Sequence, residues 1–479
     1  MKEVSIEKQT AIGRYPKYDR EVVQKNLGEA LSRLDKKIVV LDDDPTGVQT
    51  VHDVHVYTDW TKESVQQGFE EDNSIFFILT NSRGFTEQVT TDVHKEIAEN
   101  VIEVSKKLGK DFILISRGDS TLRGHYPLET KILREIIEAN SDKVIDGEVI
   151  IPFFLEGGRF TIDNVHYVAN GDVLVPAGET EFAGDRTFGY KSSHLGEWIE
   201  EKSKGGFKKE EVTYISLEEL RELDYKSVES KLMAVNGFGK VVVNAVEYSD
   251  VEVFSTALVN ALMKGKNFLF RSAAALTKVI GGVSDKELLT KEELVNTENK
   301  NGGLIIVGSH VKKTTMQLEN LRKADFIEFV EFNQHLVVEV EAFEEELKRV
   351  ILVTEENILK GRTVAVYTRR DRFDLNTGNK EDELRVAVKI SDAVTSIVDL
   401  LKVRPNFIVA KGGITSSDVG TKGLHVKKAL VLGQILKGIP VWLTGEESKF
   451  PNMPYVIFPG NVGDENALLD AVTIMQPYK

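Results

Sequence analysis

The segment SRGDSTLRGH at 116–125 is rich in polar residues and follows the apolar run 112–115. It carries five side chains that can bind ligands or move protons: Arg117, Asp119, Ser120, Arg123 and His125. Two further apolar runs are also followed by polar side chains. The residues that follow them are Asp42, Asp43, Asp44 and Thr46 after 37–41, and Arg83 after 75–79.

These residue types suit a small polyhydroxylated acid as ligand. Arginine binds a carboxylate through two parallel hydrogen bonds, and we expect Arg83, Arg117 and Arg123 to do so. A carboxylate can accept the proton of a hydroxyl that attacks phosphorus. The predicted catalytic residues are Asp43 and Asp119, and the predicted substrate-binding residues are Asp42, Thr46, Arg83, Arg117, Ser120, Arg123 and His125.

The proton acceptor is one of four aspartates, Asp42, Asp43, Asp44 and Asp119. Adjacent like charges raise the pKa of at least one acid in 42–44, whereas Arg117 and Arg123 lower the pKa of Asp119. We therefore predict that Asp43 is the base and that Asp119 binds hydroxyls. If the strand continues through 44, Asp42 and Asp44 share one face and Asp43 points the opposite way.

Apolar runs alternate with helical periodicity along the first half, as in 37–44, 74–84, 86–110 and 111–116. Further strands are predicted at 148–154 and 239–246. This alternation predicts βαβ units and a largely parallel sheet, and ligands of such sheets bind at the carboxyl ends of the strands. The segment 175–201, rich in turn residues, is interpreted as a long substrate loop that leads into a helix.

A second α/β series follows. Its predicted strands are 303–310, 363–368, 406–418, 439–445 and 453–463, and its predicted helices are 311–324, 343–361, 380–403 and 425–438. The fold class is therefore α/β with two domains. We place the N-terminal domain at 1–283, a charged linker at 284–302 and the C-terminal domain at 303–479.

Glycine and hydroxyl residues follow several strands of this second half, as in VGSH at 307–310, KGGITSSDVG at 411–420 and FPGNVG at 458–463. Glycine lets backbone N–H groups approach a phosphate, and Thr415, Ser416 or Ser417 can cap the next helix. The chain has no P-loop and no GxGxxG motif. The basic cluster YTRRDR at 367–372 could meet phosphate or form salt bridges, and we favour salt bridges.

Composition narrows the function classes. The net charge of −15 disfavours nucleic acid and acidic membranes as partners. The chain has no cysteine, no apolar signal core at its N-terminus and no apolar run of membrane-spanning length. We expect a cytoplasmic protein without metal-ligand motifs, and its oligomeric state stays open, with a homodimer as one option.

The quoted motifs, together with LDDDPTGVQT at 41–50 and PGNVGDENAL at 459–468, resemble the four-carbon acid sugar kinase family over nearly the whole chain. The resemblance implies an N-terminal acid-sugar-binding domain, a C-terminal ATP-binding domain and Mg²⁺-dependent phosphorylation of an aldonate such as threonate, erythronate or an oxo-tetronate. The implied nucleotide contacts are Ser309, Gly412, Gly413, Ile414, Thr415 and Gly460. Gly118 stands where we expect a larger residue, which leaves room for a larger or branched sugar acid.

Two other function classes compete with a kinase. An isomerase or aldolase would use the aspartates and arginines without nucleotide, and a sugar-acid binding protein would have two lobes without catalysis. The glycine-rich strand ends of the second half favour the kinase.

Overall fold

The computed structural model describes residues 4–371, 373, 380–460 and 462–477, which form two compact units. The first unit holds the described residues up to Val51 and Asp59–Asp285, and the second holds His52–Thr58 and the described residues from Lys286 onward. The predicted first domain was continuous, whereas the structure places His52–Thr58 in the second unit. The predicted linker also differs, because Leu289 and Leu294 are buried in the core of the second unit.

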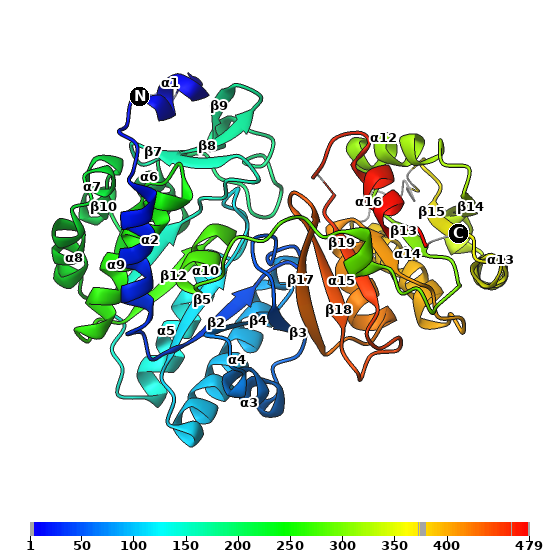
Figure 1. Ribbon diagram of the computed structural model, residues 1–479, viewed down its shortest axis with the longest axis horizontal. Coiled ribbons are helices and arrows are strands. Elements are labelled where there is room, and N and C mark those ends of the chain that lie inside the picture. The colour runs from blue at the N-terminus through cyan, green and yellow to red at the C-terminus, as the bar shows by residue number, and fades with distance from the viewer. Residues whose placement is uncertain (1–3, 372, 374–379, 461, 478–479) are drawn as a thin grey trace. The chain divides into compact units, whose positions relative to one another are not determined.

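The first unit is built on a parallel sheet (Figure 1). Its strand order is β10 (Thr213–Ile215), β11 (Gly239–Val243), β6 (Gly147–Ile151), β12 (Phe268–Ser272), β5 (Phe112–Arg117), β2 (Lys37–Asp42) and β4 (Ile75–Leu79). Each neighbouring pair is parallel. The strands β2, β4 and β5 are buried along their whole length, as expected for strands covered on both faces. Their carboxyl ends carry the predicted site residues.

Helices connect these strands, and the sequence determines where they stop. The longest is α4 (Glu87–Leu108), which matches the predicted segment 86–110. Thr86 caps its start by accepting from the N–H of Val89, and Gly109 ends it with a φ of 64°. The other helices of the unit are α1 (Lys8–Gly13), α2 (Arg20–Leu31), α3 (Lys62–Glu70), α5 (Leu128–Asn140), α6 (Leu195–Lys202), α7 (Leu217–Arg221), α8 (Tyr225–Ala234), α9 (Tyr248–Met263) and α10 (Ala274–Ile280).

A small antiparallel sheet belongs to the same unit. Its strand order is β1 (Ile6–Glu7), β9 (Val173–Pro176), β8 (Val165–Asn170) and β7 (Arg159–Ile162). The backbone of Thr161 bonds that of Ala245, which ties β7 to the end of β11. The predicted substrate loop leaves β9 and enters α6, so the expectation of a loop that leads into a helix is confirmed.

The second unit has a mixed sheet. Its strand order is β3 (Val54–Tyr57), β17 (Lys428–Leu436), β18 (Ile439–Thr444), β19 (Pro454–Phe458), β16 (Ile408–Lys411), β13 (Leu304–Val307), β15 (Thr363–Thr368) and β14 (Ile327–Phe332). The strands from β19 to β14 pair in parallel, and those from β3 to β19 pair antiparallel. Its helices are α11 (Lys291–Leu294), α12 (Lys312–Leu321), α13 (Val340–Leu359), α14 (Lys380–Asp399), α15 (Gly413–Asp418) and α16 (Ala467–Met475).

The predicted helix 425–438 is wrong, because this segment forms the strand β17. Its burial alternates residue by residue along Lys428–Leu436, with Ala429, Val431 and Ile435 buried. That period of two belongs to a strand with one face in the core. The apolar residues between the buried ones mask this alternation in the sequence and imitate a helical pattern.

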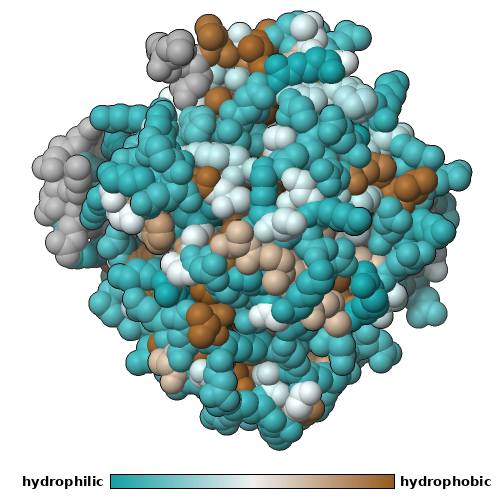
Figure 2. All heavy atoms as spheres, turned by 90° about the vertical axis from the view of Figure 1, so that its left-hand side faces the viewer, coloured by the Kyte–Doolittle hydropathy of each residue, from teal (hydrophilic) through white to brown (hydrophobic). Residues whose placement is uncertain are grey.

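Hydrophilic side chains dominate the surface of the first unit that Figure 2 shows, with hydrophobic residues interspersed among them. Among the residues that the structure describes, no helix combines the length and apolar character needed to cross a membrane.

Candidate active site

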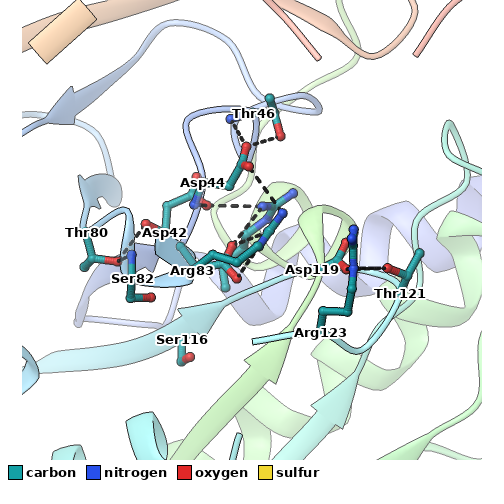
Figure 3. A network of polar contacts seen from close by, with 12 residues as sticks. Asp42, Asp44, Thr46, Thr80, Ser82, Arg83, Ser116, Asp119, Thr121 and Arg123 are labelled. Carbon is teal, nitrogen blue, oxygen red and sulfur yellow. Dashed lines mark hydrogen bonds and ion pairs between the residues drawn. The ribbon is translucent and has the colours of Figure 1, made fainter. Parts of the chain in front are cut away.

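The carboxyl ends of β2, β4 and β5 bring aspartates and arginines together (Figure 3). Arg83 lies in a short 3₁₀ turn after β4. Its Nη2 donates to Oδ1 of Asp43 at 2.6 Å and its Nε donates to Oδ2 at 3.2 Å, while Nη1 donates to Oδ2 of Asp44 at 3.2 Å. One guanidinium therefore bridges two neighbouring carboxylates.

A second arginine completes this cluster. Nη1 of Arg117, at the end of β5, donates to Oδ1 of Asp42 at 3.2 Å and lies 3.8 Å from Oδ1 of Asp43. The predicted alternation of Asp42 and Asp44 against Asp43 is wrong. The strand β2 ends at Asp42, so Asp43 and Asp44 lie in a bend beyond it and Arg83 binds both.

The three aspartates differ in proton affinity. Burial raises the pKa of Asp42 to about 7, although Arg117 opposes it. Burial also raises the pKa of Asp43, against the effects of Arg83 and Arg271. The pKa of Asp44 is lowered, because Arg83 and the hydrogen bonds from Thr46 outweigh burial. Asp42 and Asp43 lie against the same arginine, and the charge of Asp43 adds to the raised pKa of Asp42.

Asp119 belongs to a neighbouring network on the loop after β5 (Figure 3). Its Oδ2 accepts from Nε of Arg123 at 2.6 Å and from the hydroxyl of Thr121. Burial would raise the pKa of Asp119, but Arg83 and Arg123 hold it well below its usual range. Asp119 is therefore ionised, as predicted, although Arg83 rather than Arg117 is the second cation.

The other predicted substrate-binding residues make contacts within the protein. Thr46 donates its backbone N–H and its hydroxyl to Asp44, at 2.8 and 2.5 Å. The carbonyl of Ser120 accepts from His166 at 2.8 Å, and Nε2 of His125 donates to the carbonyl of Phe85 at 3.0 Å. These contacts shape the loops around the aspartates.

Sequence reasoning missed Arg271 and Glu129. Arg271 lies in β12, where its Nη1 donates to Oε2 of Glu129 at 3.1 Å and its Nη2 donates to the carbonyl of Arg123 at 2.7 Å. Glu129 also accepts from Ser82 and Ser116. A lone arginine inside the apolar strand FLFRS was the available signal, because a buried charge needs a partner.

The predicted substrate loop packs on the loop 116–125. The guanidinium of Arg123 lies 5.1 Å from the ring centroid of Phe182, and its Nη1 lies 3.8 Å from Oδ2 of Asp185. The hydroxyl of Tyr190 donates to the carbonyl of Thr121 at 2.7 Å. The long loop thus covers the segment that carries Asp119, which supports its interpretation as part of the site.

The second unit contains a cavity of about 540 Å³ at the ends of β13, β15 and β16. Its lining includes the predicted residues Ser309, Gly412, Gly413, Ile414 and Thr415, together with Gly308, His310 and Thr368. The helix α14 supplies an apolar wall that the sequence reasoning missed, with Val386, Ile390 and Val394. A cavity with an apolar wall and a polar glycine rim has the chemistry of a nucleotide site, because a base is apolar and phosphates need donors.

The glycine rim depends on an unusual backbone conformation. Gly412 has a φ of 123°, a region that side-chain-bearing residues rarely adopt, and a Cβ there would lie 3.1 Å from Cβ of Ser309. The predicted caps are wrong, because Thr415, Ser416 and Ser417 lie inside α15, whose N-cap residue is Gly412 and whose start has no side-chain cap. The hydroxyl of Ser416 instead donates to the carbonyl of Ala410.

Lys411 joins two of the predicted nucleotide loops. It lies at the end of β16, fully buried, and its Nζ donates to the carbonyls of Pro459 and Gly460 at 2.5 and 3.2 Å. Burial lowers the pKa of Lys411 to about 7. Gly460 is thereby held beside the glycine rim, although it is not among the residues that line the cavity.

The two arginines at the start of the basic cluster after β15 have different kinds of contact. Arg369 forms the predicted salt bridges, at 3.8 Å to Glu331 and 3.3 Å to Asp371. Nη2 of Arg370 donates to the carbonyl of Ser309 at 2.6 Å and to Oγ1 of Thr315 at 2.8 Å. Its Nε and Nη1 are buried and have no acceptor among the residues that the structure describes. Position 372 lies outside these residues.

Known families match the two halves of the chain. Residues 38–280 match the sugar-binding N-terminal domain, and residues 304–468 match the nucleotide-binding C-terminal domain. The first match alone spans just over half of the chain. The chain therefore belongs to the family of the sugar-binding N-terminal domain. A search of the curated proteins finds no match.

Two solved structures are similar to most of the chain. Haemophilus influenzae protein HI1011 is 17% identical, with a TM-score of 0.60 over 91% of this chain and 100% of its own. A Salmonella typhimurium LT2 protein provisionally named a tRNA synthase is 16% identical, with a TM-score of 0.63 over 91% of this chain and 98% of its own. At these identities, the likeness supports the fold alone.

Proposed function

We propose that the protein is an ATP-dependent kinase that phosphorylates a hydroxyl of a small sugar acid. The observation that carries this proposal is the pairing, in one chain, of a sugar-binding domain with an aspartate–arginine cluster and a nucleotide-binding domain with a glycine-rimmed cavity. Aldonates such as threonate, erythronate or an oxo-tetronate, and larger or branched sugar acids, fit this class.

The first unit supplies the acid–base chemistry. The attacking hydroxyl needs a proton acceptor, and an acceptor works best when its pKa lies near the working pH. The pair Asp42–Asp43 has raised pKa values. We propose that this pair accepts the proton, with Asp43 as the predicted base, and that ionised Asp119 binds substrate hydroxyls.

The second unit suits the triphosphate of ATP. The two orphaned donors of Arg370 are buried beside Ser309, where an anionic oxygen would satisfy them. The backbone at Gly412 leaves the rim without side-chain bulk. Mg²⁺ would enter with the phosphates, because it usually binds through substrate phosphates and retained waters.

An assay of ADP release tests the proposal. Purified protein with Mg²⁺ and ATP is incubated with threonate, erythronate, an oxo-tetronate and longer aldonates, and with alditols that lack the carboxylate. We expect ADP release with at least one aldonate and a phosphorylated product by mass spectrometry. ATP binding without turnover on any acid of the panel would contradict a kinase with this substrate class.

A further inference from the structure

The three arginines predicted to bind the substrate carboxylate are already paired. Arg83 binds Asp43 and Asp44, Arg117 binds Asp42, and Arg123 binds Asp119. These guanidiniums keep further N–H groups, and Nε of Arg117 is buried without an acceptor among the described residues, but the charge of each is already shared with a buried aspartate. A cation that no aspartate neutralises would therefore attract the carboxylate of a sugar acid more strongly.

Arg159, the first residue of β7, also lies in the first unit and carries a charge that no ion pair neutralises among the described residues. It forms no ion pair with any carboxylate of the described residues, and its Nη1 donates to the carbonyl of Gly157. Its Nε is buried without an acceptor, and no acceptor is found for Nη2 among those residues. The edge formed by Nε and Nη2 is one of the two edges through which arginine binds carboxylate bidentately.

Phe182 places Arg159 beside the loop 116–125. The guanidinium of Arg159 lies 5.6 Å from the ring centroid of Phe182, and that of Arg123 lies 5.1 Å from the same centroid. Burial lowers the pKa of Arg159, while the charge of Asp119 raises it and that of Arg123 lowers it. The three charges are therefore close enough to act on one another.

A purely packing role explains less of this arrangement. Stacking on Phe182 accounts for the position of the guanidinium, but it leaves Nε desolvated and unsatisfied. An unsatisfied buried donor is costly, and a carboxylate at this edge would remove that cost. The substrate loop that carries Phe182 would then present Arg159 to the ligand.

We propose that Arg159 binds the carboxylate of the sugar acid through Nε and Nη2. The assignment rests on the proposed function, in that the ligand is a sugar acid, and it orients the molecule. The carboxylate lies at Arg159 and the hydroxyls lie toward Asp119 and Arg123. Selectivity for acids over the corresponding sugar alcohols then depends on Arg159.

Calorimetry on the full-length protein tests this assignment, with threonate and erythronate as probes and threitol and erythritol as their neutral counterparts. We expect Arg159→Met to weaken binding of the aldonates by at least about 30-fold, the order expected for a charged hydrogen-bonded pair, and to leave ATP binding unchanged. Arg159→Lys should restore only part of the affinity, because lysine lacks the fork.

Arg134→Met is the matched control. Arg134 also stacks on a phenylalanine, at 4.7 Å from the centroid of Phe238, but it is paired with Glu138. Aldonate affinity that is unchanged in Arg159→Met, or equally weakened in Arg134→Met, would overturn the assignment. These binding measurements do not depend on turnover, so a wild-type protein that binds aldonates without releasing ADP would contradict only the kinase. A wild-type protein that binds no aldonate would overturn both.

Discussion

The guanidinium of Arg271 fills the space that a side chain at Gly118 would occupy. A Cβ built on Gly118 would overlap the guanidinium of Arg271, which is held by Glu129 and by the carbonyl of Arg123. The missing side chain at 118 therefore lets Arg271 brace the loop that carries Asp119 and Arg123. This explains the small residue at a position where a larger one is expected.

Substitution of Gly118 by alanine should disturb this brace. We expect Gly118→Ala to destabilise the protein by about 1–3 kcal/mol, as overpacking of a filled site does, and to weaken sugar-acid binding. Chemical denaturation and calorimetry measure the two effects. Gly28→Ala is the control, because a Cβ there meets nothing within 4 Å in the exposed part of α2. Wild-type stability and affinity in Gly118→Ala would show that Arg271 has room to move.

Substitutions of Asp43 and Asp119 should change different quantities, kcat for Asp43 and sugar-acid affinity for Asp119. Asp43→Asn removes the predicted proton acceptor, so kcat should fall by about 10²–10⁴-fold while sugar-acid affinity changes little. Asp119→Asn removes an ionised ligand of Arg123, so it should chiefly weaken affinity, by about 10-fold or more. Steady-state kinetics and calorimetry on both variants decide. An active Asp43→Asn together with an inactive Asp119→Asn of normal affinity would reverse the two roles.

The sequence predicted β2, β4 and β5 because these strands are continuous apolar runs followed by polar residues. It also predicted α4 from its helical periodicity, but it predicted neither β12 nor the small antiparallel sheet of the first unit. It failed at β17, where leucines on the half-buried face hide the period of two. It also failed to place β3 in the second unit, because strand pairing over a long sequence separation has no local signal.

The aspartate–arginine cluster was predictable because its members lie at or just after strand ends, as Asp42, Arg83 and Arg117 do. Arg271 and Arg159 were missed because each begins or interrupts a strand far along the chain, and only the folded structure brings them to the loop 116–125. Pairing was also invisible in the sequence. Residue type alone does not distinguish an arginine that is already neutralised from one that is left for a ligand.

Arg370 and Arg369 provide a matched test of the nucleotide site. We expect Arg370→Met to weaken ATP binding by at least about 10-fold, because a phosphate oxygen would lose a charged donor, and to change adenosine binding little. Arg369→Met should bind ATP normally, because Arg369 is already paired with Glu331 and Asp371. Calorimetry with ATP and adenosine measures this. Equal ATP affinity in the two variants would place the phosphates away from Arg370.

The pH dependence of turnover should depend on Arg117. Burial raises the pKa of Asp42 to about 7 and Arg117 lowers it. Only the ionised carboxylate accepts a proton, so kcat/KM should rise with pH and level off above about pH 7. Arg117→Met removes the opposing cation, so this rise should move to higher pH, while Arg117→Lys should keep it near the wild-type position. The measurement is kcat/KM against pH for the three proteins, with melting temperatures to confirm that each is folded. A profile that is flat between pH 5 and 9 in the wild type, or unmoved in Arg117→Met, would exclude the Asp42–Asp43 pair as the proton acceptor.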